Sequence, residues 1–260
     1  MKEFFSVYGC RNQIRTFLFI ILLPAFVIAS QPSGNIDENA YNVESDISEL
    51  NAGMRVCLDP GHPSFEDDKL FEAVINRKVA YYLEECLLEK GFSVLITVQD
   101  IPKHQILNPY FDNEGEQEHS MLEVKTPEER AEVCNRWDGD YFLSIHHNYA
   151  YDRSTNHSLV LYHSDENEEP CSPESEILAE IIRGELEQTM EVDDAEVNGD
   201  NALLGESLIV LKNTAMTAIL TEASFYSNPE ERERLNDDAY LEQEAGAICR
   251  AFVEFIEKSN

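Results

Sequence analysis

Basic residues are scarce in this chain of 260 residues. It has 19 lysines and arginines against 51 aspartates and glutamates, which gives a formal net charge of −32. This charge excludes binding to nucleic acid or to an anionic membrane surface by electrostatic attraction. Two explanations of the acidity stay open: a well-solvated surface, or attraction to cationic groups on a substrate or partner.

Cysteine pairs with metal-binding spacing are also missing. The chain has six cysteines but no CxxC pair, so the sequence excludes a cysteine-rich structural zinc site. Cys10 lies near the N-terminus, and most of the other five lie in apolar patterns. We expect most of these to be small core residues, and a single disulfide stays an open alternative.

Long apolar runs are absent as well. The most apolar segment, Phe17 to Ala29, has 13 residues, whereas a helix that crosses a bilayer needs about 20. Basic residues precede this segment and Ser30 follows it, a pattern typical of a secretory signal peptide. We therefore predict that residues 1–30 are a signal peptide and that the chain is exported, to a periplasm or to the outside of the cell. An uncleaved anchor is the alternative.

The rest of the chain reads as a linker and one folded domain. Residues 31–52 are polar and acidic without a clear period, which favours a linker, and the domain is predicted over residues 53–260. Short apolar runs predict strands at 54–58, 92–98, 141–145, 158–162 and 216–221. Helical spacing or capping signals indicate helices at 72–90, 127–137, 177–186 and 241–256. This alternation predicts an α/β fold: a single domain with a mixed, mostly parallel sheet flanked by helices. Loops are predicted at 100–125 and 191–200.

Residues able to do chemistry follow three of the predicted strands. His62 follows the first, His146 and His147 follow the third, and Glu222 follows the last. Such strand ends are where ligands gather in α/β sheets. Two histidines and one carboxylate are the ligand set of a catalytic zinc ion, and Glu72 could supply that carboxylate.

Each of these residues also has an ordinary explanation. A histidine in a turn is often only a turn residue, and the helix dipole favours a glutamate such as Glu72 in a first turn. Because side chains alternate along a strand, only one of His146 and His147 is expected to face the site.

Four stretches occur in an order that resembles a known family. They are "CLDPGHPS", "FEAVINRKVAYYLEECLLEKGFSVLIT", "TPEERAEVCNRWDGDYFLSIHHN" and "AILTEASFYSNPEERERL". Together they cover about residues 53–258 and resemble the zinc-dependent N-acetylmuramoyl-L-alanine amidases of the amidase 3 family. The resemblance implies that His62, Glu72 and His146 bind Zn²⁺. It also implies that Glu222 is the catalytic carboxylate, acting as general base and then as general acid on a zinc-activated water.

The resemblance further implies a substrate and a location. The family hydrolyses the amide between N-acetylmuramic acid and L-alanine in peptidoglycan, so the chain is expected to be a secreted cell-wall hydrolase. Peptidoglycan is the expected partner, with no nucleic acid and no stable membrane insertion after signal removal. Asn148 is a candidate substrate-binding residue, and Ser144 a candidate for the same or a supporting role.

Two other functions stay open at this point. One is a zinc-dependent hydrolase of another amide or peptide on the same fold. The other is a non-catalytic cell-wall-binding protein, against which the presence of Glu222 argues.

In some relatives a helix blocks the site until an activator protein binds. Here the amphipathic period of 177–186 favours packing on the sheet. His104 and His119 lie in the 100–125 segment, as surface residues or as part of a lid.

Overall fold

The computed structural model describes residues 51–62, 70–98, 126–165, 167 and 169–259. The predicted signal peptide and most of the predicted linker lie outside the described residues, as does the 100–125 segment. No helix in the described part of the chain is long and apolar enough to cross a membrane.

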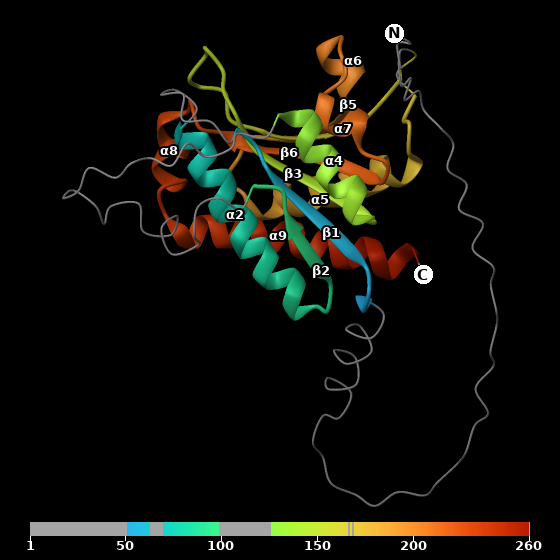
Figure 1. Cartoon of the computed structure of the whole chain (residues 1–260). Coiled ribbons are helices and arrows are strands. Elements are labelled where there is room, and N and C mark those ends of the chain that lie inside the picture. Colours follow the sequence, from blue (N-terminus) through green and yellow to red (C-terminus); the bar gives the residue numbers. More distant parts are fainter. Residues whose placement is uncertain (1–50, 63–69, 99–125, 166, 168, 260) are drawn as a thin grey trace, which may run out of the picture.

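A six-stranded sheet forms the centre of the domain (Figure 1). Its strands are β1 (Arg55–Pro60), β2 (Ser93–Ile96), β3 (Tyr141–Asn148), β4 (Ser158–Tyr162), β5 (Ala195–Gly199) and β6 (Thr217–Phe225). The strand order is β2-β1-β3-β6-β4-β5, and only the β4–β6 pair is antiparallel. The predicted α/β domain with a mixed, mostly parallel sheet is confirmed. The three strands that carry the candidate site, β1, β3 and β6, are neighbours at its centre.

Helices cover both faces of this sheet. One face carries three helices, α2 (Leu70–Glu89), α5 (Pro173–Thr189) and α9 (Asp238–Ser259), and α9 contacts both of the others. The other face carries α4 (Pro127–Trp137) against α7 (Ile209–Asn213). Two short helices, α6 (Asp200–Leu204) and α8 (Pro229–Arg234), follow β5 and β6. Because α5 packs on β4, β5, β6 and α9, it covers the sheet as its apolar period predicted.

Local sequence signals produce the expected helix ends. The Thr126 side chain accepts a hydrogen bond from the backbone N–H of Glu129, and the Glu129 side chain accepts one from the N–H of Thr126. These two hydrogen bonds form a capping box, which is the capping signal at the start of the helix expected over 127–137. The Asn228 side chain caps α8, and Gly91 adopts a left-handed φ of 90° just beyond α2.

Two sequence expectations need correction. The 191–200 segment is not only a loop, because it contains the edge strand β5, which pairs along β4. Its polar residues have low strand propensity, and pairing with a buried neighbour overrides that propensity. In addition, β3 and β6 run beyond residues 145 and 221, so His146 and Glu222 lie within strands rather than after them.

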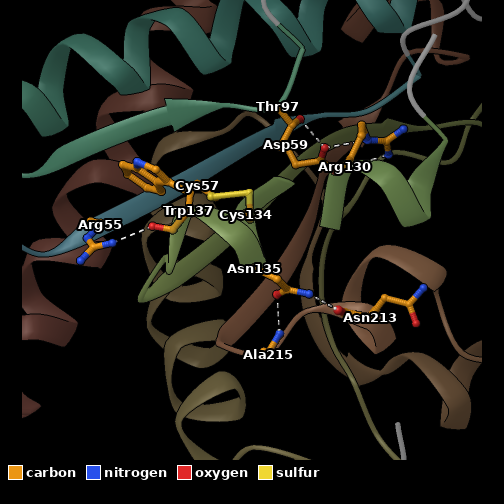
Figure 2. The surroundings of a disulfide bond; sticks show 10 residues. All are labelled: Arg55, Cys57, Asp59, Thr97, Arg130, Cys134, Asn135, Trp137, Asn213 and Ala215. Carbon is orange, nitrogen blue, oxygen red and sulfur yellow. Dashed lines mark hydrogen bonds and ion pairs between the residues drawn. A yellow bond between two sulfur atoms is a disulfide. The ribbon is translucent and has the colours of Figure 1, made fainter. Parts of the chain in front are cut away.

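The cysteines also differ from the expectation of simple core residues. Cys57 of β1 is bonded to Cys134 of α4 (Figure 2), and Cys86 of α2 is bonded to Cys249 of α9. One disulfide therefore ties a helix to the sheet, and the other joins two helices on the opposite face. The partners are 77 and 163 residues apart, which is why no local spacing revealed the pairs.

Candidate metal centre

The turn after β1 brings two histidine rings together. His62 has a φ of 53°, in the left-handed region that residues with a side chain seldom adopt. A Cβ atom at Gly61 would lie 2.0 Å from Cε1 of His146, so only glycine leaves room for that ring. The His62 and His146 rings consequently meet edge to face, with centroids 4.9 Å apart.

Glu72 completes a cluster of three possible metal ligands. It lies in the first turn of α2, and its Oε1 is 3.2 Å from His146 Nδ1 and 3.5 Å from His62 Nε2. One ligand atom from each residue lies within 4.8 Å of the other two. Glu72 and His146 are buried, whereas His62 is partly exposed. The fold thus brings together the three residues that the sequence predicted as ligands.

The chemistry of these residues fits a zinc ion. Two imidazole nitrogens and one carboxylate oxygen form the donor set of a catalytic zinc site. Burial acts to raise the pKa of Glu72, but the hydrogen bond and charge of His146, with His62, lower it overall. Burial acts to lower the pKa of His146, but Glu72 and Glu222 raise it overall. The cluster therefore favours extra positive charge, which a divalent cation supplies in place of protons.

Glu222 lies beside this cluster with an unsatisfied oxygen. It is the register partner of His146 on the adjacent strand β6. The residue is partly exposed, but its Oε2 atom is buried and has no hydrogen-bond partner. Burial, with a contribution from Glu72, raises the pKa of Glu222 to about 7, although His146 opposes the shift. A buried carboxylate oxygen without a donor is costly, and such groups are concentrated at functional sites.

Asp59, on β1, is a carboxylate with several hydrogen-bond donors, in contrast to Glu222. This fully buried carboxylate accepts hydrogen bonds from Thr97 Oγ1 at 2.6 Å and Arg130 Nε at 2.7 Å (Figure 2). It also accepts one from Ser144 Oγ at 2.9 Å. The Ser144 hydroxyl therefore supports the end of β1, three residues before His62, and is fully buried away from solvent.

His147 points away from the cluster, as strand alternation predicted. It is fully buried, with Nε2 3.0 Å from Glu244 Oε2 on α9 and Nδ1 2.9 Å from Asn76 Oδ1. The Asn76 amide nitrogen lies 3.3 Å from Glu72 Oε1 and 3.2 Å from the Gly61 carbonyl. Since Asn76 donates through its nitrogen, its oxygen accepts a hydrogen bond from the Nδ1–H of His147. His147 thus supports Glu72 indirectly through Asn76.

Asn148 lies at the end of β3, two residues after His146. It is partly exposed, and its Oδ1 accepts a hydrogen bond from the backbone N–H of Tyr149 at 2.8 Å. Its role in substrate binding stays a prediction.

Sequence reasoning missed several residues around the site. Glu244 had a visible signal, because it is a charged residue within the apolar stripe of the last helix. Tyr226 and Arg232 had none, because their proximity to the site depends on how β6 and α8 pack against α2.

The chain is similar to known proteins. The family model for N-acetylmuramoyl-L-alanine amidase (Amidase_3) matches residues 56–254. The N-acetylmuramoyl-L-alanine amidase CwlM of Bacillus licheniformis is 28% identical over 207 residues, 76% of this chain and 69% of that protein. An uncharacterized cell wall amidase of Bacillus anthracis (pXO2-42) is 22% identical over 229 residues. That match takes 85% of this chain but spans only 39% of the relative's length.

A solved structure shares the fold. The CwlD amidase from Clostridioides difficile, solved in complex with the GerS lipoprotein, superposes with a TM-score of 0.60 at 22% identity. The superposition covers 79% of this chain and all of that one.

Proposed function

The chain belongs to the N-acetylmuramoyl-L-alanine amidase family, and we propose that it is an exported zinc hydrolase that cleaves the amide between N-acetylmuramic acid and L-alanine in peptidoglycan. One observation carries this proposal. His62, Glu72 and His146 converge beside the buried, unpaired oxygen of Glu222. A protein that only bound the cell wall would have no use for such a carboxylate.

His62, Glu72 and His146 would hold the zinc ion. A zinc ion bound there would act as a Lewis acid toward the scissile carbonyl and would make a coordinated water acidic near neutral pH. Two of the three ligands are already fixed: Asn76 holds Glu72, and the His146 ring lies across Gly61. This preorganisation lowers the cost of assembling the site.

Glu222 is the proton carrier in this mechanism. As a carboxylate it accepts a proton at Oε2 from the water that attacks the carbonyl carbon. It then returns that proton to the amide nitrogen as the C–N bond breaks, because the nitrogen leaves readily only when protonated. Burial raises the pKa of Glu222 to about 7 in the metal-free chain, and the positive charge of a bound zinc ion would lower it and keep the residue ionised as a base.

Export is supported by the cysteines. Disulfides persist mainly in oxidising compartments, and the described chain contains one on each face of the sheet. The predicted signal peptide, residues 1–30, and linker, residues 31–52, complete this proposal, with residues 53–260 as the catalytic domain.

The experiment measures metal content and product release on the same protein. Residues 31–260 are purified, assayed for bound zinc, and incubated with peptidoglycan while newly freed L-alanine N-termini are counted. We expect about one zinc ion per chain and release that stops when a chelator removes the metal. Bound zinc without release would mean that a different amide is the substrate. No zinc at all would refute the metal centre.

A further inference from the structure

An aromatic wall borders the metal centre on one side. Phe71 directly precedes Glu72 on α2, and Tyr226 follows β6, four residues after Glu222. Their rings are 6.3 Å apart. The backbone N–H of Tyr226 donates to the Asn148 carbonyl at 3.0 Å, two residues after His146, and burial with contributions from Glu72 and Glu222 raises the pKa of Tyr226 to about 12. The wall is therefore continuous with the candidate active site.

Arg232 lies on this wall. Its guanidinium carbon is 3.9 Å from the centroid of the Phe71 ring, in a cation–π contact. Its charge also acts on Tyr226, where it opposes the rise in pKa. Arg232 is an exposed residue of the short helix α8. The contact with Phe71 thus holds an exposed guanidinium against the residue that precedes Glu72.

The electrostatic setting of Arg232 is unusual for this chain. Acidic residues outnumber basic ones by 51 to 19, and most described arginines pair with a carboxylate: Arg55, Arg130, Arg136, Arg183, Arg234 and Arg250. Arg232 forms no ion pair with any carboxylate of the described residues, although Glu230 and Glu233 are its close neighbours in sequence. A positive group is thus left available beside the site.

The same side of the site is extended by exposed aromatic residues. The Tyr149 ring lies 5.7 Å from that of Tyr226, and the Tyr151 ring lies 5.7 Å from that of Tyr149. Tyr149 is 46% exposed and Tyr151 is 95% exposed. Arg153 also lies here and donates to the Ser227 carbonyl. We call the aromatic wall together with Arg232, Tyr149, Tyr151 and Arg153 the rim. The rim is aromatic and cationic, whereas the chain as a whole is strongly acidic.

We propose that the rim binds the peptide portion of the substrate and that Arg232 pairs with a carboxylate of that peptide beyond the scissile amide. This inference rests on the proposed amidase function. Of the two portions joined by that amide, the sugar offers no negative charge, whereas a peptide carries at least its terminal carboxylate. The overall charge of the chain repels such a group, and a planar guanidinium can bind it through two parallel hydrogen bonds.

The test compares two substrates that differ only in charge. One is an N-acetylmuramoyl dipeptide with free carboxylates on its second residue, and the other is the same compound with those groups as carboxamides. KM and kcat are measured for the zinc-loaded wild type and for Arg232→Gln and Arg232→Lys. Arg183→Gln is the matched control, because it removes the same charge from α5, where Arg183 pairs with Glu180 and Glu187.

We expect Arg232→Gln to raise KM about tenfold for the carboxylate substrate, with little change in kcat and little effect on the carboxamide. Arg232→Lys should recover part of the loss, and Arg183→Gln should match the wild type. If the wild type cleaves both compounds but Arg232→Gln changes neither KM, or raises both equally, the carboxylate-binding role is wrong while the amidase function stands. If the zinc-loaded wild type cleaves neither compound, the proposed function fails and this inference fails with it.

Discussion

Asp59 on β1 and Glu222 on β6 are two carboxylates of the same sheet, on the two strands that flank β3, and their hydrogen bonding differs. Asp59 is fully buried and receives hydrogen bonds from Thr97, Arg130 and Ser144. Glu222 has a buried oxygen with no donor at all. A carboxylate with hydrogen-bond donors holds the segments that donate to it in place. A buried carboxylate oxygen without a donor is unfavourable in the folded state and persists mainly at functional sites. Glu244 Oε1 is also buried without a partner, so the missing donor marks Glu222 as a candidate catalytic acid only together with its position opposite the candidate ligand His146.

The largest expected effect is on turnover. Replacing Glu222 by glutamine removes the proton carrier, so we expect kcat to fall by about 10²- to 10⁴-fold, while bound zinc is unchanged. Metal analysis and release of L-alanine N-termini measure the two quantities. Near-normal turnover would show that another group moves the proton.

The next largest effect is expected on stability, at Arg130. Arg130→Met leaves the Asp59 charge buried without its cation, which should lower the free energy of unfolding by about 3–5 kcal/mol. Urea denaturation measures the loss. Arg183→Met is the control, because its ion pairs are partly exposed and its loss should change stability by about 0.5 kcal/mol or less. Equal stability of the two variants would contradict the structural role of Asp59.

The pH dependence of the metal-free protein sharpens the comparison further. The Glu222 pKa of about 7 in the folded chain exceeds its ordinary value of 4.5, because burial disfavours the charged form. The folded state therefore loses stability as pH rises from about 4.5 to 7, and the loss is complete above that window. After a chelator has removed the metal, the Glu222→Gln variant and the wild type should have the same free energy of unfolding at pH 4. At pH 8 that of the variant should be higher by up to about 3 kcal/mol.

Urea titrations at both pH values measure this difference. A constant gap between Glu222→Gln and the wild type, independent of pH, would mean that Glu222 does not titrate in this range.

The smallest effect is expected from removing a single donor to Asp59. Thr97→Val deletes one of several hydrogen bonds to this carboxylate and should lower the free energy of unfolding by about 1–2 kcal/mol. Thr214→Val is a matched control, because the Thr214 hydroxyl donates only to the neutral Leu211 carbonyl. Thermal or urea denaturation of both variants gives the comparison. If Thr214→Val lowered the free energy of unfolding more than Thr97→Val, the hydrogen bond to Asp59 would not have the expected structural role.

Much of the fold was predictable because its signals are local. The Thr126 capping box and the Asn228 cap involve atoms within three residues of each other, so the sequence spacing shows them directly. Apolar periodicity likewise located most strands and helices. The edge strand β5 was missed because its residues are polar and only pairing with β4 makes them a strand.

The candidate ligands could be named from the sequence, but their meeting could not be established from it. His62 and Glu72 are ten residues apart, whereas His146 arrives from a strand 74 residues beyond Glu72. Only the order β1-β3-β6 shows that the strand ends are neighbours. The disulfides were missed for the same reason, because each joins distant elements.

The sequence by itself determined the alternation of strands and helices, the helix caps and the residue types able to bind zinc, because these depend on neighbours a few positions away. Only the tertiary structure decided which buried carboxylate is satisfied. Asp59 finds Arg130 and Ser144 across 71 and 85 residues, while Glu222 finds no donor for Oε2. It also decided that Arg232 lies on Phe71. Such contacts depend on how distant segments pack, and no local pattern in the chain encodes them.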